Sequence, residues 1–324
     1  MDELGAEVER VAAATSFSGV VRLDRAGATV FERAYGMAHR GLSVANTVDT
    51  RFAIASGTKA LTALAVLTLV EDGTLELATT ARSVLGEDLP LIDDAVTVEQ
   101  LLSHRSGIGD YYDEDNDPGL TAPAQNLATT EEYLPILDGY PTRFPPGTEF
   151  RYNNGAFVVL ALIAERAAGV PFHDLVAQRV CGPAGMSDTA FLRSDEPDRR
   201  MALGYLERDG LRTNVFHLPV RGNGDGGVYT TVADWHALWR AFFAGVIVSP
   251  EWVAEMVRPR SVCSEPARRY GLGFWLHESS DVVFVEGYDP GVSFRSVCDP
   301  AGAFTYTVIG NTAAGAWPIA RLFG

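Results

Sequence analysis

Lysine is almost absent from this chain. Of its 26 lysine and arginine residues one is a lysine, Lys59, so the other 25 are arginine. Arginine does not lose its proton in proteins, whereas a lysine removed from water can become a neutral base. A role that needs a basic proton acceptor is therefore open to Lys59 and closed to every arginine.

Cysteine and paired histidines are also scarce. The three cysteines are far apart and contain no Cys-x-x-Cys pair, so we expect free thiols rather than a disulfide framework or a zinc knuckle. The six histidines show no His-Glu-x-x-His pattern, and no Gly-x-Ser-x-Gly sequence occurs, which argues against a zinc hydrolase and an α/β-hydrolase. We expect neither a metal nor a cofactor.

Long hydrophobic runs are missing as well. The longest, 60–70 and 156–164, fall short of the roughly 20 residues that a membrane-spanning helix needs. The first residues, MDELGAEVER, carry acids where a secretory leader carries bases. A net charge of -16 disfavours binding to nucleic acid or to an anionic membrane. We expect a cytoplasmic protein with a small-molecule partner, and the oligomeric state stays open.

The two ends of the chain resemble each other in pattern. Residues 17–37 predict two strands around a turn, and residues 281–312 predict three more, separated by Asp, Pro and Gly turns. The middle has helical periodicity, with apolar helices at 155–169 and 232–245. The pattern predicts an α/β (α+β) fold of about five antiparallel strands flanked by helices. It divides into a sheet domain, 1–80 and 225–324, and a helix-rich lobe, 81–224.

The segment FAIASGTKALTALAVLTLVEDG, residues 52–73, contains the lysine. From Ser56 onward it is apolar nearly all round, which predicts a helix buried on every side. Ser56 is at the start of this helix, and Lys59 is one turn later on the same face. A neutral Lys59 can then activate the Ser56 hydroxyl as a nucleophile. The alternative is a lysine whose stem is buried and whose ammonium reaches solvent.

Several blocks in order resemble the serine β-lactamase and penicillin-binding-protein superfamily, in particular its class C β-lactamase, D-alanyl-D-alanine carboxypeptidase and esterase branch. The resemblance runs from about Gly19 to Asn311. It rests on FAIASGTKALTALAVLTLVEDGTLEL, VTVEQLLSHRSGIGDY, RFPPGTEFRYNNGAFVVLALIAERAAGVPF, VCGPAGMSDTAF, GNGDGGVYTTVADWHALW and RYGLGFWL. It implies a β-lactamase/transpeptidase-like fold, with five antiparallel strands joined to a helical lobe.

The resemblance also implies roles for individual residues. Ser56 would be the acylated nucleophile, Lys59 its proton acceptor, and Tyr152 a second acid/base that returns the proton to the leaving group. Asn154 would hydrogen-bond Lys59 or the substrate. The backbone N–H groups of Ser56 and Tyr288 would form the oxyanion hole, next to Gly287. His104, in the Leu-Leu-x-His block, would have a structural hydrogen-bonding role.

This chain departs from the family pattern at the third motif. The family has Lys-Thr-Gly or His-x-Gly, and the best match here is Val285-Glu286-Gly287. Val285 then stands where a basic residue would hold a substrate carboxylate. Arg295 or Arg221 could compensate, although a surface arginine is the simpler interpretation. We therefore expect an esterase-like serine hydrolase acting on a small ester or amide. The alternatives are a β-lactamase or D-amino-acid-specific peptidase, and a catalytically silent ligand-binding homologue.

Two further segments carry weaker signals. The glycine-rich stretch 221–229, RGNGDGGVY, lacks the lysine of a phosphate loop, so a turn beside the cleft is the better interpretation. The acidic stretch 110–119, DYYDEDNDPG, lacks the glycine and glutamate positions of a calcium loop. We interpret it as a solvated loop near the entrance of the site.

Overall fold

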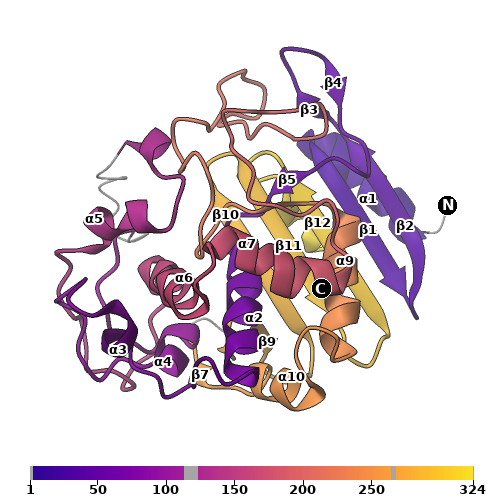
Figure 1. Ribbon diagram of the computed structural model, residues 1–324. Helices are drawn as coiled ribbons and strands as arrows, with labels where there is room; N and C mark the ends of the chain where they lie inside the picture. Colours follow the sequence, from indigo (N-terminus) through magenta and orange to yellow (C-terminus); the bar gives the residue numbers. More distant parts are fainter. Residues whose placement is uncertain (1–2, 113–122, 264–267, 324) are drawn as a thin grey trace.

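An antiparallel sheet of eight strands forms the centre of the computed structural model, which describes residues 3–112, 123–263 and 268–323 (Figure 1). The strand order is β2-β1-β12-β11-β10-β9-β8-β7. The strands are β1 (Gly19–Arg25), β2 (Ala28–Tyr35), β7 (Ser261–Val262), β8 (Arg268–Tyr270), β9 (Trp275–His277), β10 (Val283–Asp289), β11 (Val292–Cys298) and β12 (Phe304–Gly310).

The five longer strands are the ones that the sequence predicts at the two ends of the chain. The two ends of the chain meet in one sheet, because β1 pairs with β12 in an antiparallel register in which Gly19 lies opposite Gly310 and Val20 opposite Ile309. The expected number of strands, about five, omits β7, β8 and β9. Each of these has two or three residues, which is too short for an alternating pattern to show in the sequence.

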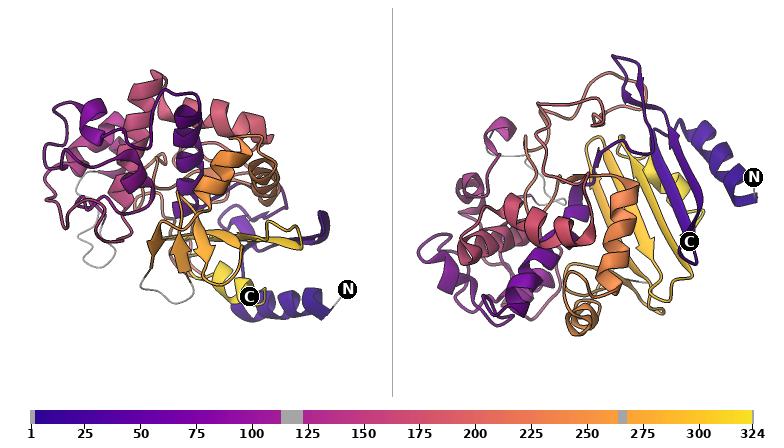
Figure 2. Two further views of the ribbon diagram at one scale, coloured as in Figure 1. Left: turned by 90° about the horizontal axis from the view of Figure 1, so that it is seen from below. Right: turned by 45° about the vertical axis from the view of Figure 1, so that its right-hand side comes forward.

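Helices cover both faces of the sheet, as the left view of Figure 2 shows. On one face, α1 (Glu3–Thr15) and α11 (Ala316–Ala320) share a core with β1 and β12. On the other face lies a larger core, to which α2 (Thr58–Glu71), α6 (Asn154–Ala168) and α9 (Val232–Phe243) contribute. The fold is thus the mixed α/β arrangement that the sequence predicts.

The remaining elements are short and connect these layers. They are β3 (Met37–His39), β4 (Val44–Ala45), β5 (Phe52–Ala53), β6 (Tyr229–Thr230), α3 (Ala81–Leu85), α4 (Val98–Leu102), α5 (Leu134–Leu137), α7 (Phe172–Val176), α8 (Gly182–Ala184), α10 (Pro250–Met256), η1 (Ala55–Gly57), η2 (Ala124–Asn126), η3 (Glu131–Tyr133) and the π-helical η4 (Ala177–Cys181). The large core includes residues from both predicted units, and the division at residues 80 and 225 stays a prediction.

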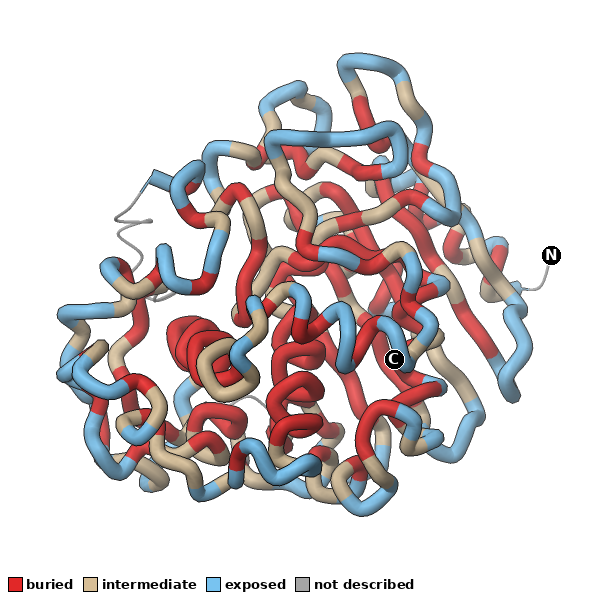
Figure 3. The backbone as a smooth tube through the Cα atoms, viewed as in Figure 1, coloured by how far each residue is buried: buried red, intermediate tan, exposed pale blue. Residues whose placement is uncertain are grey.

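Helix α2 lies at the centre of the molecule, where the tube in Figure 3 is red along almost its whole length. Every residue from Thr58 to Leu69 is buried, as the all-apolar pattern predicts. It packs against α6, which begins at an Asn153 cap and ends at Gly169 in the left-handed conformation. These two buried helices bring residues about 95 positions apart in the sequence into contact.

No single helix in the described ranges is long and apolar enough to cross a membrane. Two consecutive helical segments, Asn154–Ala168 and Phe172–Ala184, together have the length and apolar composition of a membrane span, but they are bent by 83° relative to each other. Most of the acidic stretch 110–119 lies outside the described residues, so its interpretation as a solvated loop stays a prediction.

Candidate functional site

Ser56 is held in a short turn between β5 and α2. Ala55, just before it, has a φ of 47°, a conformation that non-glycine residues seldom adopt. The Thr58 hydroxyl fastens this turn, because it donates to the Ala55 carbonyl at 2.8 Å and accepts from the Val228 N–H at 3.1 Å. Ile54 N–H also donates to the Val228 carbonyl. The nucleophile position is therefore fixed by the segment before β6, which comes some 170 residues later.

Lys59 lies one turn beyond Ser56 and is only 2% exposed. Its Nζ donates to Ser56 Oγ at 2.9 Å, to Asn154 Oδ1 at 2.8 Å and to the Asp225 carbonyl at 2.7 Å. The same positions suit a neutral amine, which would keep two donated bonds and accept the third from the Ser56 hydroxyl. The interpretation of Lys59 as a side chain with a solvent-exposed ammonium is wrong.

Asn154, at the start of α6, is oriented by hydrogen bonds to the Tyr112 carbonyl and the Asp110 carboxylate. Its Nδ2 donates to the Tyr112 carbonyl at 3.2 Å, which leaves Oδ1 facing Lys59. The Asp110 carboxylate accepts the backbone N–H groups of Asn154 and Gly155 at 2.8 and 2.9 Å. Burial raises the pKa of Asp110 to about 6 despite these bonds. Sequence reasoning missed Asp110, because its link to the site depends on α6 lying against the loop after α4.

Tyr152 lies over the lysine, with Lys59 Nζ 4.9 Å from the centre of its ring. The ring stacks on Trp275, with centroids 6.0 Å apart and planes 7° apart, and contacts the His104 ring at 4.4 Å. His104 Nδ1 accepts the Asn153 N–H, which matches the structural role implied by the resemblance. Burial, and then the positive charge of Lys59, lower the pKa of His104 well below its usual value, so this ring stays neutral.

Strand β10 packs directly on the Ser56 turn at Gly287. A Cβ at this position would collide with the Ile54 carbonyl oxygen and lie 2.9 Å from Ser56 N, so a residue larger than glycine would displace the turn. The next residue, Tyr288, is 60% exposed, and its N–H as an oxyanion donor stays a prediction. The structure thus brings Ser56, Lys59, Asn154 and Gly287 together, with Tyr152 beside Lys59.

Neither arginine proposed as a substitute for the missing basic residue lies at the site. Arg295 pairs with Glu286 at 2.8 Å, and Glu286 alternates with Gly287 along β10, so both charges belong to the face of the sheet opposite Ser56. Arg221 donates its Nε–H to the Phe191 carbonyl and does not line the pocket described below. Val285 itself is 3% exposed and belongs to the large core.

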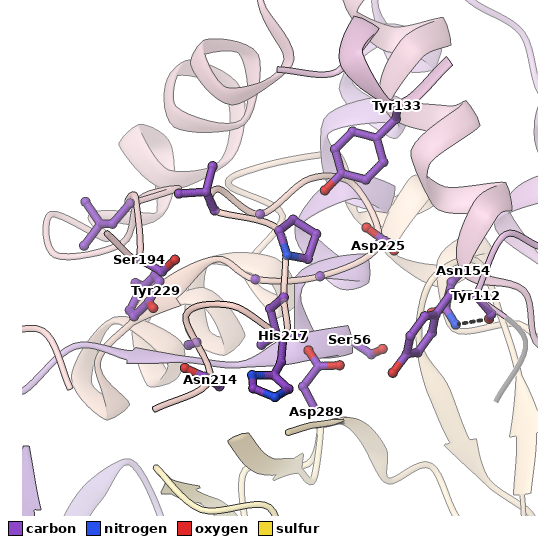
Figure 4. Close-up of a pocket in the computed structure, with 18 of the residues that line it drawn as sticks. Ser56, Tyr112, Tyr133, Asn154, Ser194, Asn214, His217, Asp225, Tyr229 and Asp289 are labelled. Carbon is purple, nitrogen blue, oxygen red and sulfur yellow. Dashed lines mark hydrogen bonds between the residues drawn. The ribbon is translucent and has the colours of Figure 1, made fainter. Parts of the chain in front are cut away.

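A pocket opens beside Ser56, and Figure 4 shows the side chains around it. The glycine-rich stretch 221–229 forms part of its wall, consistent with a turn beside the cleft. Sequence reasoning missed the other polar residues of the wall, because they come from separate loops without a shared motif. They are Tyr111, Tyr112, Tyr133, Ser194, Asn214, His217 and Asp289, whereas Asp225 is part of the glycine-rich stretch.

Comparison with known proteins gives a consistent result. The family model described as Beta-lactamase matches residues 6–322. A penicillin binding protein from Bacillus halodurans superposes with a TM-score of 0.91 at 32% identity, covering 98% of each chain. Esterase EstB from Burkholderia gladioli is 31% identical over 72% of this chain and 67% of its own. A D-aminopeptidase from Brucella anthropi is 30% identical over 81% of this chain and 49% of its own.

Proposed function

Since this chain belongs to the β-lactamase family of serine hydrolases, we propose that it cleaves a small ester or amide through an acyl-enzyme on Ser56. One observation carries the proposal. The single lysine of the chain is buried with its Nζ 2.9 Å from the Ser56 hydroxyl, at the edge of a pocket. A hydroxyl is a weak nucleophile unless an adjacent base accepts its proton.

In the acylation step, Ser56 Oγ attacks the substrate carbonyl carbon and its proton passes to Lys59. Neutral Lys59 is ready for this role, because Asn154 Oδ1 and the Asp225 carbonyl accept its two N–H bonds and direct its lone pair at Ser56. The ammonium that forms can then donate to all three oxygens. Both protonation states are thus satisfied without movement of the side chain.

The leaving group departs when the bond between the carbonyl carbon and its oxygen or nitrogen breaks. Tyr152 would supply the proton to this atom and recover it through Lys59, since the positive charge of Lys59 favours a tyrosinate beside it. Water then attacks the acyl carbon and gives a proton to neutral Lys59, the bond to Ser56 Oγ breaks, and Lys59 passes that proton to Ser56 Oγ. Gly287 packs closely on the Ser56 turn, and the backbone N–H groups of Ser56 and Tyr288 would stabilise the developing oxyanion.

A β-lactam or a D-Ala-D-Ala peptide fits this pocket poorly. Both carry a carboxylate, and the described residues that line the pocket include no arginine or lysine but two aspartates, Asp225 and Asp289. Lys59 is close, yet its hydrogen bonds already serve Ser56, Asn154 and Asp225. We therefore favour an esterase-like or amidase-like reaction over hydrolysis of penicillin.

Intact-protein mass spectrometry tests the proposal. The protein and a Ser56→Ala variant would each be exposed to a fluorophosphonate, to p-nitrophenyl butyrate and to penicillin G. We expect a stoichiometric adduct on Ser56 with the fluorophosphonate, turnover of the ester, and no lasting adduct or turnover with penicillin. The variant should give none of these signals while keeping its melting temperature.

Absence of any adduct on Ser56 would support the alternative of a catalytically silent ligand-binding homologue. Rapid acylation by penicillin G would instead support the β-lactamase alternative. It would also show that the missing basic residue in the third motif is not needed for carboxylate recognition.

A further inference from the structure

The segment 104–112 lies along the segment 151–155, which contains two of the residues assigned to the reaction, Tyr152 and Asn154. Hydrogen bonds join the two segments along their length. They run from the Arg151 N–H to the His104 carbonyl, from the Asn153 N–H to His104 Nδ1 and from the Asn153 side-chain amide to the Ile108 carbonyl. The position of Tyr152 and Asn154 therefore depends on the segment 104–112.

The Asp110 carboxylate holds the end of this contact where α6 begins. Its Oδ2 accepts the Asn154 N–H at 2.8 Å, and its Oδ1 accepts the Gly155 N–H at 2.9 Å and the Tyr112 N–H at 3.3 Å. The N–H groups of the first turn of a helix have no acceptor inside the helix, and a negative charge there also meets the positive end of the helix dipole. One side chain, 5% exposed, thus binds both α6 and its own loop.

Asn154 is held on both its backbone and its side chain by this arrangement. Asp110 accepts its backbone N–H, and the Tyr112 carbonyl accepts its Nδ2–H at 3.2 Å, the bond drawn as a dashed line in Figure 4. Tyr112 is in turn bonded to Asp110 through its own N–H. Asn154 Oδ1 is then left to accept from Lys59 Nζ at 2.8 Å. Both attachments of Asn154 therefore depend on the Asp110 carboxylate.

Asp110 can change its charge in an accessible pH range. Burial raises its pKa to about 6, although its three backbone hydrogen bonds and the positive charge of Lys59 on α2 oppose the rise. In its own loop, burial raises the pKa of Tyr111 well above the usual value, and Asp225, Tyr133 and Asp110 add to this rise. The first turn of α6 contains no acidic residue. Above about pH 6 Asp110 is therefore a carboxylate, and below it a neutral acid.

We propose that Asp110 is a positioning residue for the acylation of Ser56, whose carboxylate keeps Asn154 Oδ1 on Lys59 by accepting the first N–H groups of α6. Asp110 does not line the pocket, so it acts through Asn154 and not on the substrate. This inference rests on the proposed function. Protonation of the carboxyl weakens its bond to one of these N–H groups, which allows the first turn of α6 to shift. Lys59 then loses one of the two acceptors that direct its lone pair at Ser56.

The rate of fluorophosphonate labelling of Ser56, measured from pH 5 to pH 8 in the wild type and in Asp110→Asn, tests this role. Asparagine keeps the shape of the side chain, but it accepts only one N–H and presents its own NH2 group to the other. At pH 8 we expect labelling of the variant to be about tenfold slower. At pH 5, where the wild-type carboxyl is mostly protonated, the gap should be less than about threefold. Lys59 and Tyr152 are present in both proteins, so their own titration largely cancels in the ratio.

A double-mutant cycle with Asn154→Ala separates positioning from a general effect on folding. In a protein that already lacks the Asn154 side chain, Asp110→Asn should slow labelling at pH 8 by less than about threefold, because the two residues act in series. If Asp110→Asn does not fold, the ratio between the wild type and Asn154→Ala gives the same test. This ratio should also shrink between pH 8 and pH 5, since protonated Asp110 no longer holds Asn154 in place.

Asp234 of α9 offers a matched control. It is 7% exposed, and its Oδ2 accepts the Asp188 N–H and the Thr189 hydroxyl, each at 2.8 Å. Burial raises its pKa as well, and it does not line the pocket. Asp234→Asn should lower the melting temperature and change the labelling rate by less than about twofold at each pH. Melting temperatures at every pH ensure that only folded proteins are compared.

The outcomes separate this inference from the proposed function. Equal labelling of the wild type and Asp110→Asn, or a ratio that stays constant from pH 5 to pH 8, would refute the positioning role and leave the serine hydrolase intact. Effects of Asp110→Asn and Asn154→Ala that simply multiply would also refute it, because Asp110 would then not act through Asn154. If no fluorophosphonate adduct forms on Ser56 of the wild type, the proposed function fails, and this inference fails with it.

Discussion

Two polar clusters lie in different parts of this molecule, and each contains a buried ionisable side chain. One contains Lys59, Asn154 and Ser56. The other contains Asp24 of β1 and His236 of α9, joined by a 2.8 Å hydrogen bond between His236 Nδ1 and Asp24 Oδ2. His236 and Asp24 are 1% and 7% exposed, so this second cluster is as well shielded as the first.

The difference between the clusters is what surrounds them. Ser56 opens on the pocket described above, whereas Asp24 and His236 do not line that pocket, and Arg22 donates to both Asp24 carboxylate oxygens. Although burial opposes it, hydrogen bonds from His236 and Arg22 hold the pKa of Asp24 well below its usual range. Perturbed acids and bases therefore do not mark an active site by themselves. A nucleophile with access to a pocket distinguishes the Lys59 cluster.

Replacing Lys59 by arginine should have the largest effect on activity. Arginine keeps the positive charge but cannot accept the Ser56 proton, so we expect acylation to fall by about a thousandfold or more. The rate of fluorophosphonate labelling measures this loss. Circular dichroism and the melting temperature check that the fold is kept, since a guanidinium must fit a site that is 2% exposed.

Activity near the wild-type level in Lys59→Arg would remove the explanation offered for the single lysine. If that variant does not fold, Lys59→Met provides the same test, because an unbranched neutral side chain of similar length removes the base without adding volume.

Substituting Tyr152 by phenylalanine should have a smaller effect. The ring can still stack on Trp275 and contact His104, and only the hydroxyl is lost. We expect turnover of p-nitrophenyl butyrate to fall by about a hundredfold, which is within the range for a single acid or base. The loss should be greater for an amide than for an activated ester, because the amine needs a proton to leave. Equal losses on both substrates would reduce Tyr152 to a packing role.

A substitution at Asp24 should lower the stability of the protein and leave its activity unchanged. Asp24→Asn removes a carboxylate that is hydrogen-bonded in the folded state, so we expect a loss of about 2 kcal/mol in the free energy of unfolding at pH 7. Because folding lowers the pKa of Asp24, its stabilising effect is fully present above the ordinary carboxyl pKa of about 4. It is lost progressively as the pH falls from there toward the lowered pKa of the folded state.

Urea unfolding at pH 7 and at pH 3 measures this effect, and the gap between wild type and Asp24→Asn should shrink at the lower pH. Labelling of Ser56 at pH 7 should change by less than twofold. A large loss of labelling in a stably folded variant would show that the two clusters are coupled. The Asp24–His236 pair would then contribute to activity as well as to stability.

Much of the fold and part of the site follow from the sequence. The helix around Lys59, the long strands at both ends and the closeness of Ser56, Lys59 and Asn154 match expectations based on periodicity and on the family resemblance. The compensating role considered for Arg295 and Arg221 does not hold, and the simpler interpretation, in which neither arginine serves the site, fits their positions. Arg295 lies on the wrong face because strand residues alternate, and a register one residue out sends a side chain to the other side of the sheet.

The sequence by itself determined that one buried base lies a turn beyond a serine, because composition and helical spacing are local properties of the chain. Only the tertiary structure decided what surrounds that pair. Asp110, Asp225, Asp289 and Tyr133 reach the site from four separate segments, and their convergence depends on how α6, β10 and the connecting loops pack together. Contacts between distant segments leave no periodic signal in the chain, and in this protein they form the wall of the pocket next to the nucleophile.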